Sequence, residues 1–319
     1  MSSNSNTNSN SNNDTLLKYG CSSIILGKGH YGDYFPEKPG KLMKVTKIFP
    51  KHDELKHISA IKKIANYENY YVIPDEEGFE LKPDNPFYIY LKNKVSLNIF
   101  KDVLYCHYVN NAGSMDMIDA IENMTNYKSK DVWYSFASIL QFAKYIVEGL
   151  YYLHEHKICH LDIKPENIMI DMSKPEDKRF RIIDFGFSSV EPFTDYINDI
   201  RGTPGYFPKY IKGYSDPEPG LPLITANDLI SGLFIGNIPM RKDYKQVYKI
   251  DSYCFGRTLN HLLYYYQETF GCGAKSLCRF YGTETNVRRK IESIIAALTK
   301  DNAFDRPFIS EVRKTFFKR

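Results

Sequence analysis

Apolar residues recur three or four positions apart in two stretches of the second half of the chain. The first stretch precedes His160 and contains Phe136, Ile139, Leu140, Ala143, Ile146, Val147, Leu150 and Leu153. The second contains Val287, Ile291, Ile294, Ile295 and Leu298. This spacing puts the apolar side chains on one face of a helix. We therefore predict two core helices within a mostly helical region that covers residues 111–319.

The first third of the chain has a different pattern, in which short apolar runs lie between turn residues. Runs of this kind, bounded by Gly and Pro, are typical of strands. We predict strands over residues 16–26, 31–35, 41–49 and 103–109, a helix from Asp53 or Glu54 through Asn66, and a decorated hairpin over residues 74–100. The expected fold class is α+β, with a small antiparallel-sheet lobe (16–110) joined at Asn110–Ser114 to a larger helical lobe (111–319).

The N-terminus has a composition unlike the rest of the chain. Residues 2–13 are all Ser, Asn or Thr, which predicts a disordered tail over residues 1–15. The sequence has neither the charged-then-apolar pattern of a signal peptide nor an apolar run of about 18 residues. We therefore expect a cytoplasmic protein without a membrane partner.

Composition narrows the class of protein further. The chain has 319 residues, 43% of them hydrophobic, which is enough for one large core or two smaller ones. Its formal net charge of +4 is too small to indicate a nucleic-acid partner. The six cysteines are scattered and form no CxxC pair, which favours a reducing compartment over disulfides or a zinc site. None of these features indicates an oligomeric state.

The strongest chemical signal is the run His160-Leu161-Asp162-Ile163-Lys164-Pro165-Glu166-Asn167, followed by Asp184-Phe185-Gly186. Phosphoryl transfer needs a base for the attacking hydroxyl, a cation beside the moving phosphate and oxygen ligands for Mg²⁺. Asp162, Lys164, Asn167 and Asp184 offer these groups within a short stretch of chain. The isoleucines around them predict two buried strands that would hold the polar groups in place.

These motifs resemble the catalytic loop and metal-binding motif of the eukaryotic-type protein kinases, and Lys164-Pro165-Glu166 resembles the serine/threonine branch. The resemblance covers roughly residues 16–317. It implies a bilobal fold that binds ATP and Mg²⁺ and phosphorylates protein substrates. Asp162, Lys164 and Asn167 would be catalytic, Asn167 and Asp184 would bind the metal, and His160 and Phe185 would be packed supports.

The segment Gly27-Lys28-Gly29-His30-Tyr31-Gly32 has the form GxGxxG. Gly27, Gly29 and Gly32 allow the backbone to approach and bind phosphates. A strand is expected after it, not the helix of a dinucleotide-binding fold, so it resembles the nucleotide-covering loop of kinases. Leu26 and Tyr34 would then lie near the adenine, with Tyr34 at the place where the family usually has Val.

Two lysines compete for the phosphate-binding role on the next strand. Lys44 and Lys47 are three apart and so face opposite sides of a strand. We favour Lys44 because it follows the Pro39-Gly40 turn closely. In the resemblance, a helix glutamate pairs with this lysine. Glu54 is the preferred partner although it is close in sequence, and His57 and Glu68 remain alternatives.

The segment Cys106-His107-Tyr108-Val109 resembles the kinase hinge, which binds adenine through its backbone. Cys106 would be the gatekeeper, Tyr108 would contact the nucleotide, and Ser114 or Asp116 would touch the ribose.

Several departures from the family pattern have predicted consequences. Leu161 replaces the usual Arg, which implies activity without phosphorylation of the activation loop. Gly202-Thr203-Pro204-Gly205-Tyr206 resembles the end of the activation segment, and Thr203 is expected to bond Asp162 and Lys164. The Ala-Pro-Glu that usually follows is missing, so Arg306 lacks its glutamate, and Asp251 or another acid is expected to substitute. Asp251 is also expected to accept backbone N–H groups of the catalytic loop.

Residues 211–247 form an insert relative to the family. Its apolar content predicts a segment folded on the helical lobe, which either selects substrates or replaces the missing glutamate anchor. The favoured function is a serine/threonine protein kinase. The rivals are a pseudokinase that acts as a binding scaffold and a small-molecule phosphotransferase.

Overall fold

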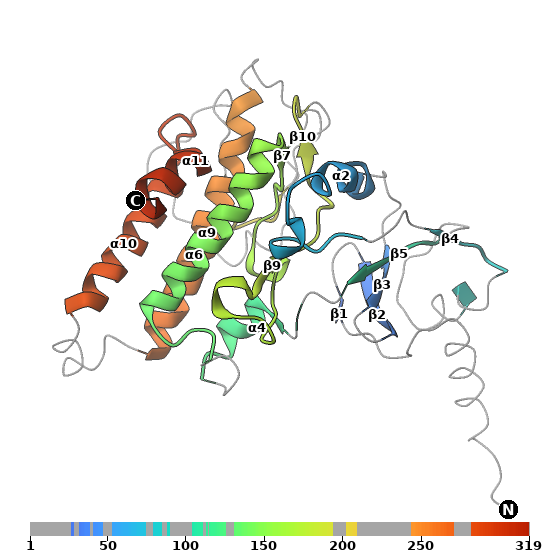
Figure 1. Ribbon diagram of the computed structural model, residues 1–319, viewed down its shortest axis with the longest axis horizontal. Coiled ribbons are helices and arrows are strands. Elements are labelled where there is room, and N and C mark those ends of the chain that lie inside the picture. The colour runs from blue at the N-terminus through green and yellow to red at the C-terminus, as the bar shows by residue number, and fades with distance from the viewer. Residues whose placement is uncertain are drawn as a thin grey trace, which may run out of the picture. The chain divides into compact units, whose positions relative to one another are not determined.

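The computed structural model describes residues 27–28, 32–38, 41–46, 53–74, 79–84, 88–89, 104–110, 113, 115–125, 131–193, 202–208, 244–270 and 282–318. The chain forms two compact units (Figure 1). One consists of Met1–Ile58 with Val72–Asn111, and the other of Ser59–Tyr71 with Ala112–Arg319. The predicted tail (1–15) and most of the predicted insert (211–243) lie outside the described residues. The lobe boundaries expected from the sequence stay a prediction.

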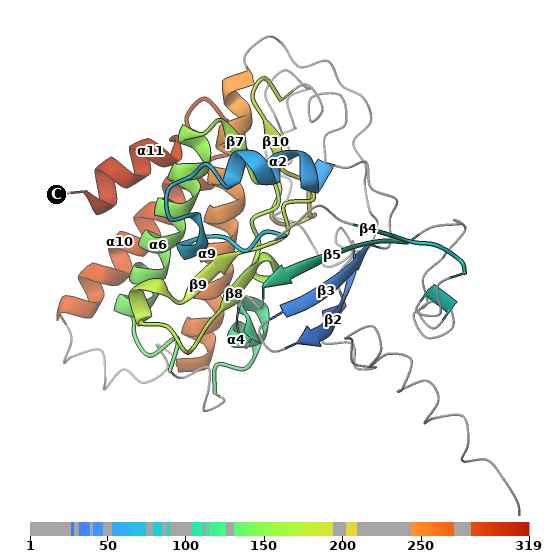
Figure 2. The same cartoon turned by 45° about the vertical axis from the view of Figure 1, so that its right-hand side comes forward.

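The smaller unit contains a five-stranded antiparallel sheet with the order β1-β2-β3-β5-β4. Figure 2 labels β2, β3, β5 and β4 of this sheet. Its strands are β1 (Gly27–Lys28), β2 (Gly32–Lys38), β3 (Lys41–Thr46), β4 (Phe79–Leu81) and β5 (Leu104–Asn110). The register shifts between Pro36 and Lys38, where proline has no N–H to donate to the ladder. Strands are confirmed near 31–35, 41–49 and 103–109, whereas residues 16–26 lie outside the described part.

Helix α2 (Asp53–Ile61) is shorter than predicted. Beyond it, Ile64 N–H bonds the carbonyl three residues back, at 2.9 Å, and Asn66 has a left-handed backbone with φ 57°. A left-handed residue cannot continue a right-handed helix, so the chain enters the 3₁₀ turn η1 (Tyr67–Asn69) instead. Of the predicted inner stripe, Ile58, Ile61 and Ile64 are buried, whereas Ala65 is exposed.

Three long helices lie side by side in the larger unit: α6 (Phe136–Glu155), α9 (Tyr248–Phe270) and α10 (Gly282–Leu298) (Figure 1). Both predicted core helices are confirmed as α6 and α10. Ser135 caps α6 by accepting the Ser138 N–H at 3.2 Å. A Cβ at Gly256 would come within 2.7 Å of Leu298 Cβ, so the close contact between α9 and α10 requires glycine at this position.

Two short sheets of the larger unit frame the candidate active site. One has the order β6-β8-β9, with β6 (Met115–Asp116), β8 (Ile168–Ile170) and β9 (Phe180–Ile182); the other pairs β7 (Ile158–Cys159) with β10 (Ser189–Val190). The two buried strands expected around the catalytic residues are confirmed as β8 and β9. The chain between β7 and β8 carries Asp162, and the chain between β9 and β10 carries Asp184.

The remaining elements of the larger unit are short: α4 (Met117–Glu122), η2 (Pro165–Asn167), η3 (Glu176–Lys178), η4 (Tyr244–Val247), α11 (Ile309–Val312) and the π-helical turn η5 (Arg313–Phe317). An aromatic cluster packs between α6 and β9, in which Phe142 lies edge-on to Phe180 at 4.9 Å and Trp133 stacks on Phe180 at 5.8 Å. Over the described part of the chain, no helix combines the length and apolarity needed to cross a membrane.

Candidate active site

Asp251 of α9 fixes the position of the candidate catalytic loop. Its side chain is fully buried. One carboxylate oxygen accepts the His160 N–H at 2.9 Å, and the other accepts the Leu161 N–H at 2.7 Å. These bonds hold Leu161 in a left-handed backbone conformation, φ 67°, which a non-glycine residue adopts only when its surroundings impose it. The expectation that Asp251 accepts backbone N–H groups is confirmed.

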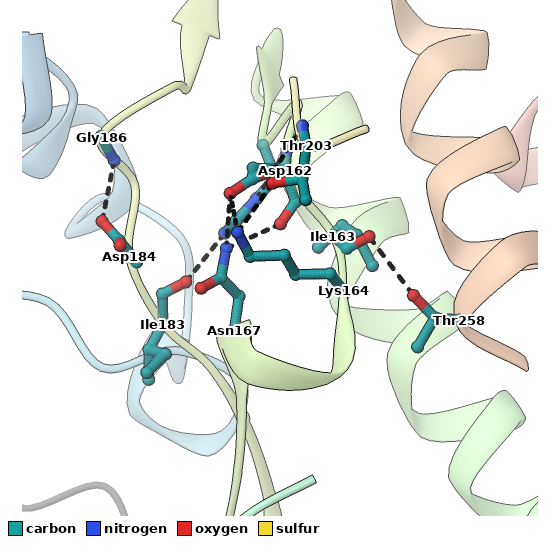
Figure 3. A network of polar contacts seen from close by, with 10 residues as sticks. Asp162, Ile163, Lys164, Asn167, Ile183, Asp184, Gly186, Thr203 and Thr258 are labelled. Carbon is teal, nitrogen blue, oxygen red and sulfur yellow. Dashed lines mark hydrogen bonds and ion pairs between the residues drawn. The ribbon is translucent and has the colours of Figure 1, made fainter. Parts of the chain in front are cut away.

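Asp162 lies at the centre of a network of polar contacts (Figure 3). Its Oδ1 accepts the Thr203 hydroxyl at 2.6 Å and the Thr203 N–H at 3.2 Å. Its Oδ2 accepts the Asn167 amide at 2.9 Å and lies 3.1 Å from Lys164 Nζ. Lys164 Nζ also donates to the Thr203 hydroxyl at 2.7 Å. The expected bonds of Thr203 to Asp162 and Lys164 are confirmed, and together these donors fix the orientation of the carboxylate.

The loop that carries Asp184 is tied to the same network. Ile183 N–H donates to the Asn167 carbonyl at 3.0 Å, and His160 Nε2 lies 3.0 Å from the Ile183 carbonyl. Asp184 has φ 62°, and the Gly186 N–H approaches its carboxylate at 3.4 Å (Figure 3). Asp162, Asn167 and Asp184 are therefore held on one framework of the larger unit.

Phe185 is packed between two aromatic rings. It lies 4.9 Å from the His160 ring and edge-on to Tyr71 at 5.9 Å. Tyr71 is itself buried, donates its hydroxyl to the Gly149 carbonyl and pairs with Ile182 as an isolated bridge. His160 and Phe185 are packed supports, as expected. The contribution of Tyr71 was missed, because only tertiary contact brings it to Phe185.

The donor set of Asn167 and Asp184 fits a magnesium ion. The Asn167 amide nitrogen donates to the backbone carbonyl of Asp162 at 2.8 Å and to its carboxylate at 2.9 Å. The amide oxygen consequently points away from Asp162 (Figure 3). Amide and carboxylate oxygens are the hard ligands that Mg²⁺ prefers. These two residues would hold the ion.

Two serines of the described chain after Asp184 bear on phosphorylation of this segment. Leu161 has an uncharged side chain and is fully buried, so it cannot bind a phosphate as an arginine would. Ser188 and Ser189 are also buried, and Ser188 donates its hydroxyl to the Phe185 carbonyl at 2.7 Å. Neither serine can accept a phosphate without local unfolding.

Arg306 corrects one expectation, because its partners are not acidic. Its guanidinium donates to the backbone carbonyls of Lys249, Lys300 and Asp301, at 2.7 to 3.2 Å, and lies over the Tyr253 ring at 4.7 Å. Among the described residues, no carboxylate pairs with it, and Asp251 is used by the catalytic loop. Burial lowers the pKa of Arg306 to about 10. Among the described residues, backbone carbonyls in the first turn of α9 and just after the end of α10 take the place of the expected ion pair.

The predicted nucleotide-binding residues belong mainly to the smaller unit. Leu26, Gly29, Lys47 and Ser114 lie outside the described residues. Of the others, the structure places Gly27 in β1, Gly32 and Tyr34 in β2, Lys44 in β3, Glu54 in α2, and Cys106 and Tyr108 in β5. Lys44 is the register partner of both Tyr34 and His107. Their nucleotide-binding roles stay predictions.

The side chains of three of the predicted residues are described, Cys106 and His57 in the smaller unit and Glu68 in the larger unit. Cys106 and His57 are buried, and Glu68 is exposed. In the larger unit, Asp116 caps α4 by accepting the Asp119 N–H at 2.8 Å, and burial raises the pKa of its carboxyl. The partner of the phosphate lysine stays open between Glu54 and its alternatives.

His154, Cys159 and Asp251 place three potential metal ligands within 4.8 Å of one another. Both oxygens of Asp251 already accept backbone N–H groups, and His154 Nε2 bonds one of them at 2.9 Å. Burial raises the pKa of the Cys159 thiol well above its usual value, which opposes the thiolate that a metal needs. We assign this cluster to support of the catalytic loop.

Comparison with known proteins agrees with this geometry. The family model described as "Protein kinase domain" matches residues 103–315, more than half of the chain. The chain therefore belongs to the protein kinase family, and the predicted bilobal α+β kinase fold is confirmed.

Curated relatives match parts of the chain. "Serine/threonine-protein kinase 17A" of Oryctolagus cuniculus is 27% identical over 175 residues, which are 55% of this chain and 42% of that protein. "Probable serine/threonine-protein kinase HSL1" of Saccharomyces cerevisiae is 32% identical over 107 residues, 33% of this chain and 7% of that protein. The chain thus spans less than half the length of both. The solved structure "ROP18 kinase domain in complex with AMP-PNP and sucrose" matches with a TM-score of 0.49 and 14% identity, over 91% of this chain and 76% of that chain.

Proposed function

We propose that the chain transfers the γ-phosphoryl group of ATP, with Mg²⁺, to serine or threonine hydroxyls of protein substrates in the cytoplasm. The network of Asp162, Lys164, Asn167 and Thr203 carries this proposal. It presents a carboxylate and an ammonium group side by side, held by a segment that would border a bound peptide. Lys164-Pro165-Glu166 and the names of the curated relatives support the serine/threonine assignment.

Each residue has a distinct role in the proposed reaction. Asp162 orients the attacking hydroxyl and accepts its proton, because its carboxylate is fixed from both sides by donors. Lys164 places a positive charge where the transferred phosphoryl group becomes more negative. Asn167 and Asp184 hold Mg²⁺, which neutralises phosphate charge when bound. Residues 202–208, which we call the docking segment, include Thr203. Through its bonds to Asp162 and Lys164, Thr203 holds these two side chains beside the docking segment.

A direct assay separates this proposal from its rivals. The full chain is purified free of protein kinases from the expression host. It is incubated with radiolabelled ATP, Mg²⁺ and generic protein acceptors, and the amino acids that carry the label are identified. Label on serine or threonine that disappears in Asp162→Asn supports the proposal. ATP binding without turnover would indicate a pseudokinase, and label transferred only to small alcohols would indicate a small-molecule phosphotransferase.

Lys44→Met is expected to remove phosphoryl transfer, and Lys47→Met to leave it nearly unchanged. We propose that Lys44 binds the α- and β-phosphates, because it follows the Pro39-Gly40 turn and pairs in register with Tyr34. Initial rates at several ATP concentrations test this, with Lys47→Met as the matched control. The reverse result would assign the phosphate lysine to Lys47.

Phosphatase treatment is expected to leave the activity within about twofold of the untreated enzyme. The reason is that Leu161 carries no charge, and the nearby Ser188 and Ser189 are buried. Activity is measured before and after treatment, and phosphate is quantified by mass spectrometry. Loss of activity that returns on rephosphorylation at Ser188, Ser189 or Thr194 would contradict the expectation.

A further inference from the structure

The docking segment is bound at both ends of a tight turn. Thr203 bonds Asp162, and the Tyr206 and Phe207 N–H groups both donate to the Thr203 carbonyl at 3.1 Å. Helix α9 binds the other side of the turn. Arg257 Nε donates to the Gly205 carbonyl at 3.0 Å, and Tyr206 Oη lies 2.6 Å from His261 Nδ1. A shift of Tyr206 is thus transmitted over three residues to Thr203.

The direction of the Tyr206–His261 bond follows from the chemistry of the two groups. Burial raises the pKa of Tyr206, so the phenol keeps its proton and donates it. His261 Nδ1 accepts, which requires the neutral imidazole with its hydrogen on Nε2. In the imidazolium form both nitrogens are donors. Protonation therefore removes the acceptor that Tyr206 uses and places a positive charge in a half-buried site.

The charges around His261 come from three elements. Arg257 on α9 and burial both lower the pKa of His261 from its usual 6.5, whereas Glu122 on α4 raises it, and burial is the largest cause. The ring centroids of Tyr265 on α9 and His261 are 5.0 Å apart. The negative charge of Glu166 in η2 raises the pKa of Tyr206. The folded state thus favours neutral His261. The bond is present at neutral pH and is lost as the pH falls below about 6.5 through the lowered pKa.

We propose that His261 is a positioning residue whose neutral ring holds Tyr206 and the docking segment beside Asp162, and whose protonation loosens the segment and weakens the binding of protein substrates. This inference rests on the proposed kinase function. Its effect falls on the KM for the protein substrate, because Asp162, Lys164 and Asn167 have other supports. Loss of one hydrogen bond predicts a rise of about three- to tenfold in this KM.

The kinetic test compares wild type, His261→Gln, Tyr206→Phe and the control His156→Gln between pH 7.5 and 5.5. Gln has an oxygen acceptor that does not titrate, and His156 is an exposed histidine on the Tyr152 carbonyl. In wild type and His156→Gln, we expect the protein-substrate KM to rise at acid pH while the KM for ATP follows no such titration. His261→Gln should lose that rise, and Tyr206→Phe should have the raised KM at every pH. The same pH profile in wild type and His261→Gln would overturn the proposal.

A second measurement does not depend on kinase activity. Hydrogen exchange of the amides at Thr203, Tyr206 and Phe207 is compared between wild type and His261→Gln at each pH. As the pH falls below 6.5, we expect wild type to lose protection relative to His261→Gln, even in a protein that fails the kinase assay. Equal protection of the two proteins at every acid pH at which both stay folded would overturn the proposal that protonated His261 loosens the docking segment, whatever the enzymatic result.

Discussion

Replacing Asp162 by Asn is expected to lower the rate of phosphoryl transfer by ~10³-fold or more while the protein stays folded. The substitution keeps the size of the side chain but removes the group that accepts the hydroxyl proton, and loss of a general base typically costs two to four orders of magnitude. In the wild type, Lys164 and Asn167 hold the Asp162 carboxylate as donors. The new Asn side chain would place an amide N–H donor among these donors. Initial rates with one protein substrate, together with a thermal melt, measure both parts of the prediction.

Asp184→Ala is expected to reach a similar loss by another route, because it removes an oxygen ligand for Mg²⁺. Asp171→Asn is the matched control, since among the described residues the Asp171 side chain bonds only Ser173, in the turn after β8. Its activity should equal that of wild type. Unchanged turnover in Asp162→Asn or Asp184→Ala, with protein free of host kinases, would falsify the enzyme assignment.

The parts of this fold that could be predicted have a local cause. The apolar stripes of α6 and α10 repeat with the period of a helix, so the sequence alone indicated them. The order of Asp162, Asn167 and Asp184 was equally visible, because these groups lie close together in the chain. The end of α2 was less visible, since the backbone hydrogen bonds tighten to three-residue turns after Ile61 although Ile64 continues the apolar stripe.

The parts that could not be predicted depend on contacts between distant segments. The contacts of Tyr71 with Phe185 and of His261 with Tyr206 join segments far apart in the sequence, so they depend on the tertiary packing. Arg306 is the clearest case. The missing glutamate suggested another acid, but backbone carbonyls at the ends of helices supply the acceptors, and a carbonyl carries no sequence signal. Sequence patterns thus identify chemical groups more readily than the residues that hold them.

Asp251 has the largest expected effect on stability among the residues described. It is fully buried and accepts two backbone N–H groups. Removal leaves these donors without an acceptor, at about 1–3 kcal/mol each. It also releases Leu161 from a left-handed conformation that costs roughly 1–2 kcal/mol, so part of the loss is offset when the loop relaxes.

Asp251→Ala is therefore expected to lower the free energy of unfolding by about 3–5 kcal/mol, within the range for loss of one partner of a buried charged contact. The melting temperature should fall by roughly 6–20 °C for a domain of this size. Turnover should fall more than ATP binding, because the relaxed loop no longer presents Asp162 beside Thr203. Asp305→Ala is the control, since among the described residues this exposed carboxylate accepts only the Asn302 amide, at 2.9 Å, and its effect should stay within about 0.5 kcal/mol. If the two variants melted at the same temperature, Asp251 would not be the anchor of the catalytic loop.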